Sequence, residues 1–264
     1  MSGPASVPRE DFLTVTDLHH WFGGLHVIND VSFACRPGIV KAIIGPNGAG
    51  KTTLFNLIAG SLAPVSGSIS FRGLPIAGLK SHEVARRGVS RTFQATKLFP
   101  RMSVLENVMV GRHTRSRAGF LAGMIGPALT AREEARIRKD CLDLLDSLGI
   151  ADLAHRDAQS LPFGRQRVVE FARALAADPS LILLDEPACG LNPRETEEVG
   201  ELIAGIRGRG ITILIVEHDM SLVMGISDEI IALNYGQKIA EGTPREVQGN
   251  PEVVAIYLGG AQDA

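Results

Sequence analysis

Apolar and polar residues alternate along this chain in stretches typical of strands and of helices. Alternation with a period of two predicts edge strands near the start, and short, mostly apolar runs predict buried strands further on. Helical stretches separate most of the later strands, which indicates a mainly parallel sheet covered on both faces. The predicted strands span residues 12–18, 27–35, 39–44, 68–72, 89–93, 181–184, 211–216 and 229–233.

The middle of the chain has helical patterns only. Residues 130–148 carry apolar side chains at helical spacing, and Ser103 followed by Glu106 is a capping box that predicts a helix start. We therefore expect a single α/β domain over residues 12–258, with antiparallel edge strands and an inserted all-helical subdomain. The expected core spans residues 12–94 and 166–258, and the expected subdomain spans about residues 95–165.

A glycine-rich segment joins the third predicted strand to a helix and matches the pattern G-x-x-x-x-G-K-[ST] of P-loop NTPases. Glycines let the backbone bend around an anion, and amides at a helix N-terminus stabilise negative charge. We expect Lys51 to reach the β- and γ-phosphates of a nucleotide and Thr52 to ligate Mg²⁺. A tight turn that binds nothing is the alternative. The candidate cofactor-binding residues here are Gly45, Pro46, Asn47, Gly48, Ala49, Gly50, Lys51, Thr52 and Thr53.

Two carboxylates directly follow the apolar run at residues 181–184. Ligands bind at the carboxyl ends of parallel strands, so Asp185 is placed to hold Mg²⁺ directly or through water. Glu186, one residue on, is placed to polarise a water for attack on the γ-phosphate. Two solvated acids on a loop are the alternative, which the phosphate loop disfavours.

Two further polar residues lie at predicted strand ends. His218 follows the strand at 211–216, where an imidazole can position the γ-phosphate and the attacking water. Gln94 follows the strand at 89–93 and can contact Mg²⁺ or water. The alternatives are a half-buried histidine with satisfied hydrogen bonds and a glutamine that caps the next turn.

Residues 160–167 open another predicted helix. Pro162 suits the entry of a helix, and Gly164 leaves its first amides open to an anion. A second anion-binding helix start, far along the chain from the first, fits an enzyme whose active site is completed by another subunit.

Composition limits the remaining function classes. With 264 residues, 45% of them hydrophobic, the chain can bury a large core, and a net charge of −2 argues against a large nucleic-acid-binding surface. Three scattered cysteines without a C-x-x-C pair indicate a reduced, cytosolic protein with no zinc site. Neither a signal peptide nor a run of about 18 apolar residues is found, so we expect membrane contact only through a partner.

The ordered motifs resemble those of ATP-binding-cassette (ABC) ATPases over about residues 12–258. The resemblance implies that Gln94 is the Q-loop residue, which senses metal and water, and that Asp185 is the metal-side acid. It also implies that Glu186 is the catalytic base and His218 the switch histidine.

An aromatic turn also resembles the family, whereas the signature segment departs from the family pattern. Phe22, on a predicted turn at residues 21–24, matches the aromatic residue that stacks on adenine, and Val27 would line the same pocket. Ordinary edge packing is the alternative. The usual signature Leu-Ser-Gly-Gly-Gln is replaced, so the serine hydroxyl for the opposite subunit's γ-phosphate is missing. The signature residues here are Leu161, Pro162, Phe163, Gly164 and Arg165.

Several segments resemble those of ATPases from branched-chain amino-acid importers, whose relatives import amides and urea: residues 91–94, 163–167, 188–193, 217–220, 223–228 and 257–259. This resemblance implies hydrolysis of ATP with Mg²⁺ by a homo- or heterodimer of ATPase subunits bound to transmembrane permease subunits. It implies an extracytoplasmic solute-binding protein, a place on the inner face of the cell membrane, and no nucleic acid. The alternatives are the ATPase of a lipid or lipopolysaccharide exporter, a soluble ABC ATPase without a transporter, and a P-loop small-molecule kinase.

Overall fold

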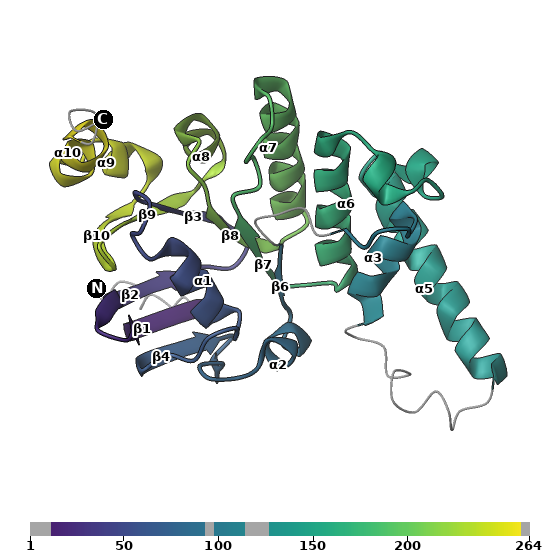
Figure 1. Ribbon diagram of the computed structural model, residues 1–264, viewed down its shortest axis with the longest axis horizontal. Helices are drawn as coiled ribbons and strands as arrows, with labels where there is room; N and C mark the ends of the chain where they lie inside the picture. The colour runs from purple at the N-terminus through teal and green to yellow at the C-terminus, as the bar shows by residue number, and fades with distance from the viewer. Residues whose placement is uncertain (1–11, 93–97, 114–126, 260–264) are drawn as a thin grey trace, which may run out of the picture.

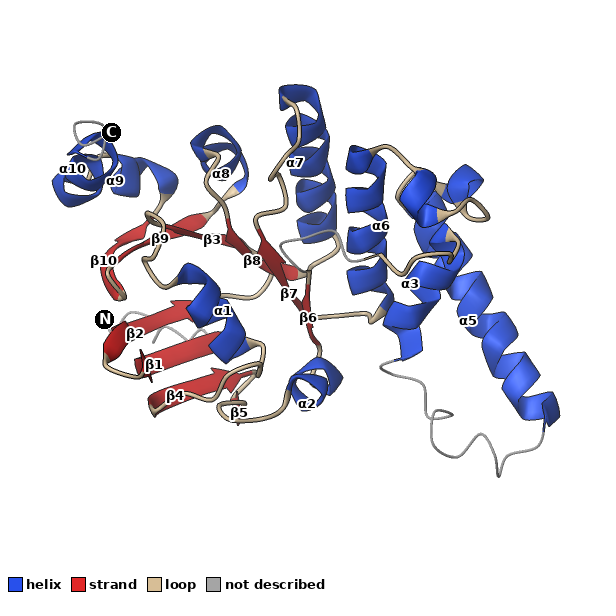
Figure 2. Ribbon diagram, viewed as in Figure 1, coloured by secondary structure: helices blue, strands red, loops and turns tan. Residues whose placement is uncertain are grey.

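The computed structural model describes residues 12–92, 98–113 and 127–259, and two sheets form its centre (Figures 1 and 2). The antiparallel sheet has the order β2-β1-β4-β5, and the larger sheet has the order β10-β9-β3-β8-β7-β6. The strands are β1 (Leu13–Phe22), β2 (Leu25–Cys35), β3 (Val40–Ile44), β4 (Ser66–Phe71), β5 (Leu74–Pro75), β6 (Val89–Arg91), β7 (Leu181–Asp185), β8 (Thr212–Val216), β9 (Glu229–Asn234) and β10 (Gln237–Gly242).

The larger sheet is parallel from β9 through β3, β8 and β7 to β6, and β10 pairs antiparallel with β9 at its edge. Every residue of β3, β7 and β8 is buried, as expected for parallel strands covered on both faces. The predicted mainly parallel sheet with antiparallel edge strands is therefore confirmed.

Several strands differ from the sequence prediction: the two-residue β5 is not predicted, and β1 and β10 differ more. β1 continues through Trp21 and Phe22, which pair with His26 and Leu25 of β2, so only the two glycines between the strands form the turn. β10 is not predicted at all. None of its side chains is buried, so its sequence lacks the apolar alternation that signals a strand.

Helices cover both faces of the parallel sheet (Figure 1). α1 (Lys51–Ile58) lies between the two sheets, where its apolar residues join a hydrophobic cluster with β1, β2 and β3. α7 (Pro193–Gly208) and α8 (Met220–Ile226) cover the opposite face. The remaining helices are α2 (Ser81–Arg86), α3 (Val104–His113), α5 (Pro127–Ser147), α6 (Phe163–Ala176), α9 (Pro244–Gln248) and α10 (Pro251–Gly259). Within the described residues, no helix has both the length and the apolar character needed to span a bilayer.

α3, α5 and α6 form a helical part at one end of the molecule (Figure 2). The predicted capping box is confirmed: the backbone N of Ser103 donates to Glu106 Oε2 at 2.7 Å, and the backbone N of Glu106 donates to Ser103 Oγ at 3.2 Å. α6 begins at Phe163, within the segment predicted to open a helix, with Pro162 at its N-cap. α6 packs both against α3 and α5 and against the parallel sheet, so it belongs to both parts of the molecule. The subdomain limit at about residue 165 is therefore a proposal.

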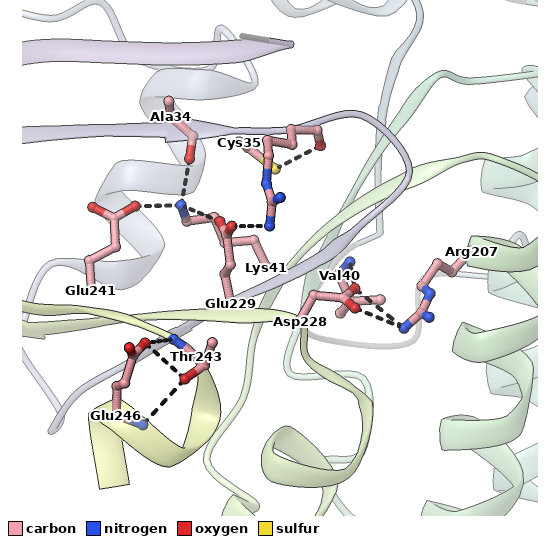
Figure 3. A network of polar contacts seen from close by, with 11 residues as sticks. Ala34, Cys35, Val40, Lys41, Arg207, Asp228, Glu229, Glu241, Thr243 and Glu246 are labelled. Carbon is pink, nitrogen blue, oxygen red and sulfur yellow. Dashed lines mark hydrogen bonds and ion pairs between the residues drawn. The ribbon is translucent and has the colours of Figure 1, made fainter. Parts of the chain in front are cut away.

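A buried charge connects the two sheets (Figure 3). Lys41 on β3 is 1% exposed, and its ammonium donates to the carbonyl oxygen of Ala34 on β2 at 2.5 Å. It also donates to Glu229 on β9 at 3.0 Å and to Glu241 on β10. Burial alone would raise the pKa of Glu229, but hydrogen bonds and charges from Lys41 and Arg36 hold it below its ordinary value.

We expect Lys41→Met to lower the free energy of unfolding by about 3 kcal/mol, because removing one partner of a buried ion pair leaves charges poorly compensated. The value lies at the lower end of the usual range, since Arg36 still contacts Glu229 and Lys238 still contacts Glu241. Urea unfolding at neutral pH, followed by circular dichroism, measures the change.

Lys238→Met is the matched control, because Lys238 contacts the same Glu241 from a side chain that is 29% exposed. Exposed ion pairs contribute about 0–1 kcal/mol, so the control should lose far less stability. Equal losses of unfolding free energy in the two variants would show that burial does not strengthen the ion pairs of Lys41. In the unsubstituted protein, the ionised Glu229 contributes fully to the free energy of unfolding above its ordinary pKa of 4.5. This contribution is lost as the pH falls through the lower pKa that Glu229 has in the folded state.

Candidate functional site

The predicted phosphate loop runs from the end of β3 to the first residue of α1. Gly45 lies so close to β9 that a Cβ there would be 2.2 Å from the carbonyl oxygen of Leu233. Gly50 has a φ of 98°, and a Cβ there would be 2.7 Å from the carbonyl oxygen of Val27. Both positions therefore require glycine. No described side chain caps α1, so its first amides are open to an anion.

Lys51 is buried at the start of α1. Its ammonium donates to the carbonyl oxygen of Gly45 at 2.7 Å and to that of Pro46 at 2.9 Å. Burial lowers the pKa of Lys51, and the charges of Glu186 and Asp185 partly oppose that shift. A desolvated ammonium beside open amides is stabilised by an anion such as a phosphate.

The ends of the neighbouring strands β7 and β8 bring Glu186 and His218 together. Glu186 Oε1 lies 3.0 Å from Nε2 of His218. Glu186 has a φ of 49°, a left-handed conformation that is rare for a residue with a side chain. Its backbone N donates to the carbonyl oxygen of Val216 on β8 at 2.9 Å, which helps to hold this conformation. A carboxylate beside an imidazole can accept and hold a proton taken from water.

Asp185 ends β7 and is 1% exposed. Its Oδ2 accepts a hydrogen bond from Nη2 of Arg91 at 2.8 Å, whereas its Oδ1 has no hydrogen-bond partner among the described residues. An unpaired buried carboxylate oxygen is costly. Carboxylate and hydroxyl oxygens are the ligands that Mg²⁺ prefers, so Asp185 and the hydroxyl of Thr52 fit this ion.

A cavity of about 240 Å³ lies between the phosphate loop and the ends of β7 and β8. It brings most of the predicted site residues together. Three predicted residues adjoin the cavity without lining it: Gly45, Pro46 and Asp185. The first two accept hydrogen bonds from the lining residue Lys51, and the third directly precedes the lining residue Glu186. The lining residues are Val27, Asn47, Gly48, Ala49, Gly50, Lys51, Thr52, Thr53, Glu186 and His218.

Phe22 does not line this cavity. It ends β1 and pairs with Leu25, two positions before the cavity residue Val27. Its side chain is 49% exposed, and its ring meets that of His20 edge-on with 4.8 Å between the centroids. A half-exposed aromatic ring supported from one side is free to stack on a planar ligand.

The signature segment also lies outside the cavity lining of its own chain. Leu161 is buried, Pro162 is the N-cap of α6, and no described side chain caps this helix. Phe163 is exposed, whereas a Cβ on Gly164 would lie 2.7 Å from Oε1 of Glu195 on α7. With Arg165 in its first turn, α6 has an open start. Gln94 belongs to residues 93–97, outside the described residues, so its role stays a prediction.

Two charged residues near the site, Arg91 and Glu217, have no role predicted from the sequence. Arg91 holds Asp185, as described above. Glu217 is buried: its carboxylate accepts hydrogen bonds from the backbone N of Ala188 at 3.1 Å and from that of His218 at 2.9 Å. Arg91 ends the short strand β6, and Glu217 directly follows the apolar strand β8. A charge at a strand end needs a partner when it is buried. That signal is present in the sequence, but it does not identify the partner.

Comparison with known proteins agrees with this geometry. A family model described as "ABC transporter" matches residues 28–189, and one described as "Branched-chain amino acid ATP-binding cassette transporter" matches residues 237–263. The high-affinity branched-chain amino acid transport ATP-binding protein LivG of Salmonella typhimurium is 43% identical over 253 residues, which cover 96% of this chain and 99% of LivG. BraF of Pseudomonas aeruginosa, which carries the same description, is 42% identical over 250 residues, covering 94% of this chain and 98% of BraF.

A solved structure supports the same assignment. The crystal structure of the ADP conformation of an ATP-binding cassette of an ABC transporter superposes with a TM-score of 0.81 at 29% identity. The superposition covers 94% of this chain and 99% of the other. Similarity in sequence and in fold therefore extends over almost the whole length, and the chain belongs to the ABC transporter family of ATP-binding proteins.

Proposed function

We propose that this chain is the ATP-hydrolysing, energy-coupling subunit of an ABC importer for branched-chain amino acids or related amides. The observation that carries the proposal is the cavity in which the phosphate loop faces a carboxylate–imidazole pair with 3.0 Å between Glu186 Oε1 and His218 Nε2. A cavity that only binds a nucleotide would not need such a pair. The substrate class rests on LivG and BraF and on the match at residues 237–263.

The phosphate loop binds the phosphates of ATP. Its amides and the helix start of α1 stabilise the negative charge, and Lys51 leaves its two carbonyl partners for the phosphate oxygens. The ring of Phe22 stacks on adenine, and Val27 lines the same side of the cavity. These contacts hold the nucleotide with its terminal phosphate near Glu186.

Glu186 accepts the proton of the attacking water, and His218 keeps the carboxylate oriented through their hydrogen bond. Thr52 and Asp185 would hold Mg²⁺, with Gln94 as a third candidate ligand. When bound, Mg²⁺ neutralises charge on the phosphate oxygens. The left-handed backbone at Glu186 places its side chain at a sharp change of direction after β7, where it reaches the cavity instead of continuing the strand.

A second ATPase subunit completes each site. Leu161 to Arg165 lie outside the cavity of their own chain, yet α6 begins there with open amides that suit a phosphate. Across a dimer, this helix start and the Arg165 guanidinium face the nucleotide held by the other subunit. The partners are an identical or related ATPase subunit, transmembrane permease subunits and an extracytoplasmic solute-binding protein, which place the chain on the inner face of the cell membrane.

Reconstitution in lipid vesicles with the permease subunits tests this function. We expect the binding protein loaded with leucine, isoleucine or valine to raise phosphate release several-fold above the rate without solute. Stimulation by urea or acetamide alone would assign the chain to the amide and urea importers. No stimulation by any solute, with unchanged ATP hydrolysis, would contradict the importer.

A further inference from the structure

Arg91, the last residue of β6, connects two elements of the nucleotide site. Its Nη2 donates to Oδ2 of Asp185 at 2.8 Å, and its Nη1 donates to Oδ1 of Asn56 on α1 at 2.6 Å. The guanidinium also lies 5.9 Å from the centroid of the Phe55 ring. The side chains of Arg91 and Asp185 are 14% and 1% exposed, so water screens this ion pair little.

Through Asn56, Arg91 contacts the helix that carries Thr52. Asn56 and Thr52 are four residues apart on the same helix, so they lie on one face, a single turn from each other. Thr52 and Asp185 are the two described candidates for Mg²⁺ binding. Arg91 therefore joins the strand that carries one candidate ligand to the helix face that carries the other.

The carboxylate of Asp185 has its two oxygens in different states. Oδ2 is held by Arg91, while Oδ1 has no hydrogen-bond partner among the described residues. Arginine suits this arrangement because its planar guanidinium presents several donors in fixed directions, which a lysine ammonium does not. With Oδ2 held, Oδ1 is the oxygen left for a metal ion or its water.

We propose that Arg91 is the positioning residue of the metal acid. It fixes Asp185 by one oxygen and, through Asn56, sets the distance between Asp185 and Thr52, so that both oxygens are in place before Mg²⁺ arrives. This inference rests on the proposed function of the site as an ATPase. Residues that orient metal ligands typically change metal affinity about 10- to 100-fold when they are replaced.

The test compares ATP affinity with and without magnesium in a Glu186→Gln background, in which hydrolysis does not interfere. Isothermal titration calorimetry gives the dissociation constant of ATP in excess EDTA and in excess magnesium chloride. For Arg91→Lys we expect an ATP affinity in EDTA within about twofold of the parent, because the phosphate loop is intact. The gain from magnesium, meaning the factor by which magnesium raises ATP affinity, should be about tenfold smaller than in the parent. For Asn56→Ala, which keeps the ion pair but loses the link to α1, we expect a smaller loss of the same kind.

Arg87→Lys is the matched control, because Arg87 directly follows α2, does not line the nucleotide cavity, and donates to the carbonyl oxygen of Pro75. Its gain from magnesium should equal that of the parent. An unchanged gain in Arg91→Lys and Asn56→Ala would overturn the proposal, and so would equal losses in EDTA and in magnesium. If Arg91→Lys does not fold, as judged by its melting temperature, Asn56→Ala decides. Failure of the parent to bind ATP in either condition would instead refute the proposed function.

Discussion

Glu186→Gln should abolish ATP hydrolysis while leaving ATP binding intact. Glutamine keeps the size of the side chain and a partner for His218, but its amide cannot accept a proton from water. Loss of a general base typically costs about 100- to 10,000-fold in rate, so we expect phosphate release to fall by at least about 100-fold. Malachite-green detection of phosphate measures the rate, and calorimetry measures ATP binding.

Because the variant binds ATP without consuming it, a dimer that closes on the nucleotide should accumulate. We expect Glu186→Gln with magnesium and ATP to elute from size-exclusion chromatography earlier than without nucleotide. Glu197→Gln on α7 is the control, since Glu197 is an exposed glutamate outside the cavity and its loss should leave the rate unchanged. Phosphate release by Glu186→Gln at the normal rate would remove Glu186 from the reaction.

Lys51→Ala should weaken ATP binding by about 10- to 100-fold. Hydrogen bonds to charged groups contribute about 1.5–3 kcal/mol, and every 1.4 kcal/mol corresponds to about a tenfold change in affinity. The substitution removes an ammonium that burial has already desolvated. Lys51 is the only cationic residue of the loop at residues 45–53, so no other group there replaces its charge. Equilibrium binding of ATP in EDTA isolates this contribution from that of magnesium.

Lys139→Ala provides the comparison, because Lys139 is an exposed lysine on α5 with the same formal charge. It should bind ATP as the unsubstituted protein does. The melting temperatures of both variants show whether the fold survives, since Gly45 and Pro46 lose a donor to their carbonyl oxygens in Lys51→Ala. Normal affinity in a folded Lys51→Ala variant would count against phosphate binding by this loop.

Local patterns explain which parts of the site the sequence predicts well. The phosphate loop is recognisable because its glycines, lysine and threonine are consecutive and lie between an apolar run and a helix. Glu186 and His218 are predicted at strand ends because each is the second residue after an apolar run, and parallel strands end at the same edge of a sheet. Their spacing of 3.0 Å, however, depends on β7 and β8 being neighbours.

Contacts between segments that are distant in the sequence account for what the sequence does not predict. Lys41 lies within an apolar run, and nothing local identifies Glu229 and Glu241 as its partners. Arg91 likewise ends a short strand and meets Asp185 and Asn56 only because β6 pairs with β7 and lies beside α1. β10 has no buried residue, and only its pairing with β9 makes it a strand.

The sequence by itself therefore determined the class of fold, the phosphate loop and the acids and histidine at strand ends, because each depends on residues that are adjacent or follow a short period. Only the tertiary structure decided which charges are buried, which oxygen of Asp185 is occupied, and that the signature segment lies outside its own cavity. These features depend on the order of strands in the sheet and on the packing of helices upon it. A side chain's partner is set by that arrangement and not by its neighbours in the chain.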